Sequence, residues 1–345
     1  MYSRNILYFE RLDSLRFIAA TMVLMFHATV PQMASLDHHS LLVWIREGHR
    51  GVNLFFALSG FLFAMIASKG QQIDYKNFIY NRFLRIFPLL LFVFLITAAL
   101  HRDDWHSDKV LGVLFMQLYL TEFQSITSLG TSWTISTEFV FYLLFPFLHT
   151  FANKYGERYL IALISLFITM RFLCLPLLKN ELVYFFSLLG RFDVLLMGML
   201  MGRFYVKKPQ CCTHYWVLPL VLLGITAYLL LLSRMPHYPA YLVLYPPIEA
   251  MLWSLLIIAV LNSQLKLSML VRWTAKLGSV SYSMYLLHPF IILQCQSIQL
   301  LENALWNAVA VGFGLILPLT IGLSFLSFYV IEKPFLDFRV RYFKD

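Results

Sequence analysis

The segment RLDSLRFIAATMVLMFHATV, residues 11–30, opens with charged side chains and then continues as an apolar stretch. A membrane-spanning helix needs about 20 mostly apolar residues, and the stretch that starts near residue 14 meets this length. His27 lies inside it. Ionisable side chains within a span are energetically costly and usually face a protein interior or a water-filled cavity. The segment therefore predicts a membrane helix that contains a candidate functional residue, the alternative being a buried histidine bonded to a neighbouring helix.

The rest of the chain has the same apolar character. Of its 345 residues, 60% are hydrophobic and 13% are charged, and the mean hydropathy is +0.71. A soluble domain cannot bury so much apolar surface, so we expect an all-α integral membrane protein with one domain over residues 1–345 and no C-terminal soluble domain. The first span has no cleavable signal pattern and is expected to be retained. The four cysteines have neither metal-ligand spacing nor a disulfide framework, so no metal site is predicted.

Apolar segments of spanning length occur about ten times along the chain. The predicted spans are residues 14–35, 51–68, 83–100, 134–152, 159–177, 184–202, 215–233, 241–261, 279–299 and 306–330. Nineteen Lys and Arg lie in segments on the side of the N-terminus and six on the other side, with Arg171 and Arg191 inside spans. Cytoplasmic loops are enriched in these residues, so both termini are predicted to be cytoplasmic. The net charge of +9 reflects this bias and attraction to anionic lipid, and it does not indicate a nucleic-acid partner.

Arg16 and His27 share one face of the first predicted helix. They are eleven residues apart, which places them about 16 Å from each other along the helix axis. Asp13 lies one turn before Arg16, and Ala20 leaves room between the two polar side chains. The face predicts a cation near the cytoplasmic surface and an imidazole deeper in the bilayer.

His288, in SYSMYLLHPF, is a second histidine in the middle of a span. Pro289 follows it and removes one backbone hydrogen bond, which other groups must satisfy. Tyr282, Tyr285 and His288 lie three residues apart and therefore share a helix face. Two interpretations stay open, a polar kink that packs two helices and a catalytic role.

Two further motifs place charged residues at the ends of spans. Arg82 and Arg85 in RFLR lie on one helix face and can clamp a phosphate, although arginines also flank spans for topological reasons. Ser136 and Glu138 in SWTISTEF lie near the outer start of the fourth predicted span. A carboxylate at this position can orient a histidine or form a structural ion pair with a cation such as Arg191.

Two motifs are interpreted as structural. GVNLFFALSGF, residues 51–61, contains glycines and Ser59, which allow helices to approach closely. GRFDVLLMG contains Arg191 and Asp193, which we interpret as a structural pair of charges.

Six motifs occur in an order that resembles the acyltransferase 3 family of membrane acyltransferases. They are RLDSLRFIAATMVLMFHA, GVNLFFALSGF, RFLRIFPL, SWTISTEFVFYLLFP, SYSMYLLHPF and IEKPF, and together they span residues 11–335. One departure is Asn53, which stands where the family usually has aspartate after GV. The resemblance implies a bacterial inner-membrane enzyme that transfers an acyl group, often acetyl, from cytoplasmic acyl-CoA to a carbohydrate hydroxyl. The acceptors usual in the family are lipopolysaccharide O-antigen, exopolysaccharide, peptidoglycan and lipid-linked oligosaccharide.

The resemblance also implies roles for individual residues. Carried onto this chain, it implies that His27 is the essential histidine and that Arg82 and Arg85 form the RxxR pair. Arg16 is the implied first-helix arginine, and Glu332 in IEKPF is the implied glutamate near the end of the last helix. No permanently bound cofactor is expected, because acyl-CoA is a substrate.

The residues and the resemblance together suggest a mechanism. We expect the phosphates of CoA to bind Arg82 and Arg85 with help from Arg16. His27 is expected to act as general base on the acceptor hydroxyl, with Glu138 as its orienting partner, and an acyl-histidine intermediate stays open. The further candidate residues are Asp13, Ser136, His288 and Glu332. The alternatives are a polytopic transporter or flippase of a glycolipid or small solute, and a non-catalytic membrane assembly protein.

Overall fold

The protein is built from helices. The computed structural model describes residues 9–33, 42–67, 72–100, 133–175, 187–234, 239–263, 269–295 and 297–343. Within these ranges the pairing of extended backbone is a single isolated bridge between Ile73 and Phe343. The all-α expectation is therefore confirmed for the described residues.

Each of the ten predicted spans falls on a helix. The longer helices are α1 (Glu10–Met33), α3 (Gly51–Ala67), α4 (Tyr75–Leu100), α7 (Trp133–Tyr155), α8 (Glu157–Cys174), α10 (Leu188–Lys207), α11 (Val217–Arg234), α12 (Pro239–Asn262) and α14 (Ser281–Cys295). The tenth is a continuous helical segment made of α15 (Ala304–Val311), η4 (Gly312–Ile316), α16 (Leu317–Ser327), η5 (Phe328–Glu332) and α17 (Lys333–Leu336). Shorter elements are α2 (Val43–Arg46), η2 (Gly48–Arg50) and α13 (Met269–Gly278).

Seven of the helices in the described ranges are long and apolar enough to cross a membrane. These are Glu10–Gln32, Gly48–Ala67, Tyr75–Leu100, Trp133–Tyr155, Val217–Arg234, Val243–Asn262 and Ala304–Leu336. The chain is thus a multi-pass membrane protein. Of the other predicted spans, α14 has 15 residues, and α8 and α10 carry charged side chains within them. The number of ten spans and the side on which the termini lie stay predictions.

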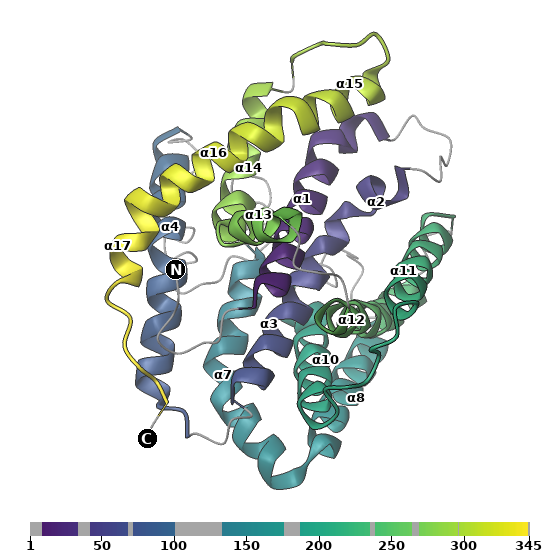
Figure 1. Cartoon of the computed structure of the whole chain (residues 1–345), viewed down its shortest axis with the longest axis vertical. Helices are drawn as coiled ribbons and strands as arrows, with labels where there is room; N and C mark the ends of the chain where they lie inside the picture. Colours follow the sequence, from purple (N-terminus) through teal and green to yellow (C-terminus); the bar gives the residue numbers. More distant parts are fainter. Residues whose placement is uncertain are drawn as a thin grey trace.

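Helix α1 runs through the middle of the molecule, and the long segment α15–α17 crosses in front of it from the top to the left edge (Figure 1). Helix α4 stands at the left edge, whereas α3, α10, α8 and α12 form the other half of the bundle with α11 at its rim. Between α7 and α8 the chain turns at Gly156, whose φ of +75° is a left-handed conformation that glycine adopts without strain.

Helix α3 is the most enclosed of the spanning helices, with 89% of its apolar window buried. Small residues make this possible, since a Cβ atom on Gly60 would lie 2.0 Å from the carbonyl oxygen of Leu195 in α10. A Cβ on Gly198 would lie 2.3 Å from the carbonyl oxygen of Ala57. Within a membrane, helices associate through such close backbone contact rather than through hydrophobic burial. The prediction that the glycines of residues 51–61 allow close helix approach is confirmed.

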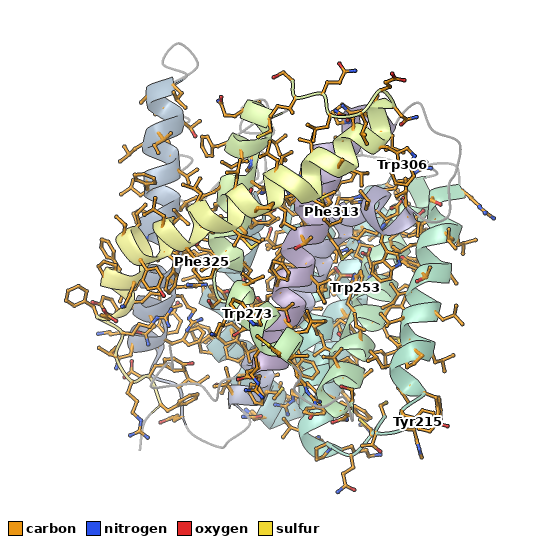
Figure 2. All side chains as sticks on the ribbon, turned by 45° about the horizontal axis from the view of Figure 1, so that its top comes forward. Tyr215, Trp253, Trp273, Trp306, Phe313 and Phe325 are labelled. Carbon is orange, nitrogen blue, oxygen red and sulfur yellow. The ribbon has the colours of Figure 1, made fainter. Side chains whose placement is uncertain are left out.

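Large aromatic side chains cover the outside of the bundle. Trp306 and Phe313 project from the long C-terminal segment, and they are 51% and 47% exposed (Figure 2). Trp273 on α13 is 54% exposed, whereas Trp253 on α12 is buried at 1%. Apolar side chains on the outer face match a lipid solvent, in which they need no partner.

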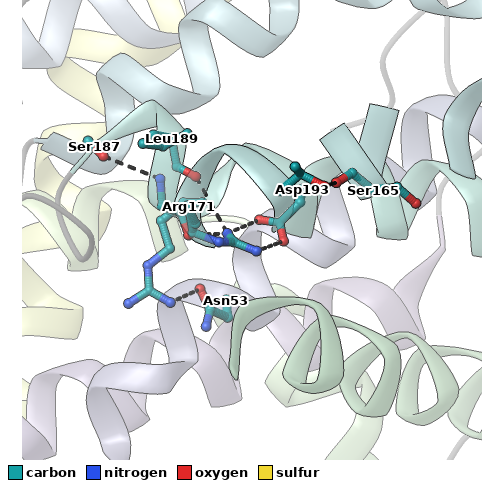
Figure 3. Close-up of polar contacts among 9 residues, drawn as sticks. Asn53, Ser165, Arg171, Ser187, Leu189 and Asp193 are labelled. Carbon is teal, nitrogen blue, oxygen red and sulfur yellow. Dashed lines mark hydrogen bonds and ion pairs between the residues drawn. The ribbon is translucent and has the colours of Figure 1, made fainter. Parts of the chain in front are cut away.

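Figure 3 shows two of the buried charged contacts that tie α10 to its neighbours. Arg171 of α8 donates to both carboxylate oxygens of Asp193 at 2.8 and 2.6 Å, and both side chains are fully buried. Arg191 instead donates to the side-chain oxygen of Asn53 at 3.0 Å. The predicted pairing of Arg191 with Asp193 is therefore corrected. Residues two apart on a helix point to different sides, so the two charges of α10 face different helices.

Candidate active site

A cavity of about 280 Å³ lies among α1, α3, α4, α7 and the segment that links α13 to α14. It brings together five of the predicted site residues, although they are far apart in sequence. These residues are Asp13, Arg16, Arg82, Arg85 and Glu138. The other polar side chains of its wall are Ser59, Thr134, Tyr142, Ser279, Ser281, Tyr282, Tyr285 and Arg339. Four arginines and two carboxylates therefore face the cavity directly.

Arg82 is the least compensated of the predicted cations. Its side chain is 9% exposed, and its guanidinium lies 5.1 Å from the ring centroid of Phe63 and 5.7 Å from that of Tyr142. Its Nε atom is buried without a hydrogen-bond partner, and Arg82 forms no ion pair with the described residues. Aromatic faces stabilise a cation only in part, so this guanidinium retains its capacity to bind an anion.

The other two predicted arginines have carboxylate partners. Arg16 donates to Asp13 at 2.8 Å, one turn earlier on α1. Arg85 donates to Glu332 at 3.1 Å. Glu332 is fully buried and also accepts from the hydroxyl of Ser283. It belongs to the π-helical segment η5, and such segments often occur at functional sites. Glu332 thus holds Arg85 at the wall of the cavity.

Glu138 lies in the wall but does not contact His27. Its carboxylate accepts hydrogen bonds from the hydroxyl groups of Ser59 and Tyr142. The expectation that Glu138 contacts and orients His27 is therefore corrected. On helix α7 this side chain points towards α3 and towards the next turn of α7. Its direction around the helix axis does not follow from its depth in the membrane. Ser136, two residues earlier, is fully buried and does not line the cavity.

His27 pairs with His288. The Nδ1 atom of His27 lies 3.2 Å from Nε2 of His288 and 3.0 Å from the carbonyl oxygen of Val23. His27 is half-buried, whereas His288 is 1% exposed. Neither His27 nor His288 lines the cavity. Tyr285 does line it, and its ring centroid lies 5.9 Å from that of His288, so the histidine pair lies beside the cavity.

The contacts of the two rings assign their tautomers. Nδ1 of each ring lies near a backbone carbonyl oxygen one turn earlier, at 3.0 Å for His27 and 3.2 Å for His288. A carbonyl oxygen only accepts, so each neutral ring carries its proton on Nδ1. The Nε2 atom of His288 is then an acceptor for the proton on Nδ1 of His27. Nε2 of His27 is left unprotonated, which is the state that a general base requires.

Arg339 is a wall residue that the sequence did not single out. It follows the motif IEKPF in a polar stretch that resembles ordinary flanking charge. Burial lowers the pKa of Arg339 to about 9, and the neighbouring charges of Arg85 and Arg82 act in the same direction. Within the described ranges no group of three or more His, Cys, Asp or Glu is arranged to bind a metal ion.

A family model described as an acyltransferase domain matches residues 9–329. Acyltransferase MdmB of Streptomyces mycarofaciens is 32% identical over 159 residues, which are 43% of this chain and 41% of the relative. Peptidoglycan O-acetyltransferase OatA of Listeria monocytogenes is 24% identical over 375 residues, 96% of this chain and 56% of the relative. O-acetyltransferase OatA of Staphylococcus aureus is 26% identical over 266 residues, 68% of this chain and 41% of the relative. The chain spans about half the length of these curated relatives, and no solved structure matches it significantly.

Proposed function

The chain belongs to the acyltransferase 3 family, and on that premise we propose that it transfers an acyl group, acetyl in the first instance, from acyl-CoA to a carbohydrate hydroxyl. The names of the two OatA relatives support an O-acetyl transfer, and one of them acts on peptidoglycan by its name. The acceptor proposed for this chain is a cell-surface or lipid-linked carbohydrate, and the proposed location is the bacterial inner membrane.

The observation that carries this proposal is Arg82, a buried guanidinium that faces a cavity and forms no ion pair with a carboxylate of the described residues. A phosphate supplies several acceptor oxygens and negative charge, both of which a guanidinium binds well. Arg85 lies three residues later on the same helix face, and Glu332 fixes its position. Acyl-CoA carries its phosphates at one end and its thioester at the other. The arginines would therefore hold the phosphates while the thioester reaches towards Tyr285 and the histidine pair.

His27 is the proposed general base. Its Nε2 atom takes the proton of the acceptor hydroxyl as the hydroxyl oxygen attacks the thioester carbonyl carbon. The carbon–sulfur bond then breaks, and the departing thiolate takes the proton back from the imidazolium. During these steps Nδ1–H of His27 donates to Val23 and to Nε2 of His288, which stabilises the positive ring. Glu138 stays a proposed catalytic residue. Its carboxylate lines the cavity, so its proposed role is exerted there and does not involve contact with His27.

Binding and transfer can be tested separately on the protein purified in lipid nanodiscs. Transfer is followed by mass spectrometry of the acylated acceptor and by release of free CoA thiol from acetyl-CoA. His27→Ala is expected to abolish both signals while CoA binding persists, because His27 does not line the cavity. A joint Arg82→Ala and Arg85→Ala variant is expected to weaken CoA binding.

Two outcomes would contradict the proposal. Normal acyl transfer by a folded His27→Ala variant would remove the base role, and unchanged CoA affinity in the double arginine variant would remove the donor site. Movement of solute across the membrane without thiol release would favour the transporter instead. Mass spectrometry of surface polysaccharide from cells with and without the gene would then identify the acceptor.

A further inference from the structure

After the long C-terminal segment the chain turns back along α4. Asn81 of α4 donates to the carbonyl oxygen of Val340 at 2.6 Å, and the Val340 amide donates back to the Asn81 side-chain oxygen at 3.0 Å. The Asp74 amide donates to the carbonyl oxygen of Tyr342 at 2.7 Å. Tyr342 is 1% exposed and packs against the ring of Phe78. The tail is visible in yellow beside α4 (Figure 1).

This docking places Arg339 in the wall of the cavity that contains Arg82 and Arg85. Arg339 immediately precedes Val340, whereas Asn81 immediately precedes Arg82. The pair of hydrogen bonds between Asn81 and Val340 therefore sets the spacing of the two arginines. Asn81 is fully buried, and its side chain makes both of these hydrogen bonds.

Among the described residues, Arg339 has no carboxylate partner of its own. Its Nε atom is buried without a hydrogen-bond partner, and its side chain forms no ion pair with the described residues. Glu332 is the carboxylate that interacts with it at longer range, and this carboxylate already binds Arg85. Arg82 lacks a partner in the same way. Two guanidinium groups without an ion pair among the described residues thus face one cavity, which Arg85 and Arg16 also line.

Like charges repel, and burial strengthens the repulsion because water screens it less. Such an arrangement is stable when the cavity receives an anion that contacts several guanidinium groups together. The anion must offer more than one negative charge and several acceptor oxygens in a compact group. Phosphate and diphosphate groups fit this description, whereas a single carboxylate does not supply enough charge.

We propose that Arg339 is a further phosphate-binding residue of the cavity, and that Asn81 is the positioning residue that holds it there through Val340. Arg339 lies beyond residues 9–329, which the family model matches. The phosphate chemistry follows from the arginines alone. Its assignment to acyl-CoA rests on the proposed function, because a phospholipid head group has the same chemistry.

The test is the affinity for CoA of the purified protein in phosphatidylcholine nanodiscs. Arg339→Gln is expected to weaken CoA binding about tenfold or more, as loss of one charge-assisted contact does. Arg341→Gln is the matched control, because Arg341 is an exposed arginine of the same tail that does not line the cavity. It is expected to change the affinity less than about twofold, as distant exposed charges do. Thermal unfolding and gel filtration verify that both variants fold.

Asn81→Leu tests the positioning role. It keeps a branched side chain with the same number of heavy atoms but removes both hydrogen bonds to Val340, so it is expected to weaken CoA binding to the extent seen with Arg339→Gln. The two changes combined are expected to weaken binding no further, because Asn81 acts through Arg339. Fully additive effects would overturn the positioning role.

Inorganic pyrophosphate and nanodiscs of anionic phosphatidylglycerol separate the possible ligands. If CoA binding weakens in the joint Arg82 and Arg85 variant but not in Arg339→Gln, the inference fails and the proposed function stands. If pyrophosphate binds in an Arg339-dependent manner and CoA does not bind, the phosphate site stands and the proposed donor fails. If phosphatidylglycerol displaces CoA from the wild type and this displacement is lost in Arg339→Gln, Arg339 binds a lipid phosphate and its assignment to acyl-CoA fails, whereas the donor site at Arg82 and Arg85 stands. Absence of binding by both CoA and pyrophosphate overturns both proposals.

Discussion

Replacement of His288 by phenylalanine should slow acyl transfer strongly without weakening donor binding. The change keeps an aromatic ring of similar shape at a site that is 1% exposed, but it removes the acceptor that lies 3.2 Å from Nδ1 of His27. A hydrogen bond to a charged group contributes about 1.5–3 kcal/mol. The ring of His27 is positively charged in the transfer step and neutral before it, so most of this contribution belongs to the transition state. We therefore expect kcat to fall about 10- to 150-fold, since about 1.4 kcal/mol corresponds to a factor of ten.

The assay is the rate of thiol release from acetyl-CoA in the presence of acceptor, measured over a range of donor concentrations. Because His288 does not line the cavity, KM for acetyl-CoA should change little. His288→Gln supplies an acceptor oxygen at about the same reach and should recover part of the lost rate. A folded His288→Phe protein that keeps more than about half of the wild-type kcat would refute the role of this contact, because that loss is far below the contribution of a charged hydrogen bond.

Three other predictions concern the scaffold. Asp193→Asn removes one partner of a buried ion pair and should lower the free energy of unfolding by about 3–5 kcal/mol, which denaturation in detergent measures. Gly60→Ala should lower the unfolding temperature because its Cβ would lie 2.0 Å from a backbone oxygen, whereas Gly224→Ala meets nothing within 4 Å and should not. The hydrogen bond from Lys207 is the largest influence on Glu157 and lowers the pKa of this carboxyl group in the folded protein, although partial burial acts in the opposite direction. Its small stabilisation is therefore present above the ordinary carboxyl pKa and is lost as the pH falls, and Lys207→Gln should make the unfolding temperature less sensitive to acid.

Hydropathy predicted where the helices occur, since every predicted span falls on a helix of the structure. The reason is local, because a segment of about 20 apolar residues in lipid must satisfy its backbone hydrogen bonds internally. The sequence also predicted that the two arginines of RFLR lie together, because residues three apart on one helix share a face. Within the described ranges, seven segments meet the criterion for a membrane span on their own, and the rest of the topology stays a prediction.

The pairing of side chains between helices was harder to predict from the sequence. Glu138 was expected to contact His27 because both were placed in the outer halves of their helices, yet it contacts Ser59 and Tyr142. The residue that contacts His27 is His288, for which the sequence left two interpretations open. Depth in the membrane follows from position in the sequence, but the direction of a side chain around the helix axis depends on packing against neighbours.

Local hydropathy and motifs of adjacent residues were enough to predict the helical class, the helices that coincide with the predicted spans, and the family. Which polar groups meet depends instead on how the helices pack against one another. This packing joined Arg171 to Asp193 and His27 to His288, and it brought Arg339 to the cavity through Asn81. The rotation and tilt of each helix follow from the sum of its contacts with residues far away in the chain, such as the backbone contact between α3 and α10. No single segment carries that information.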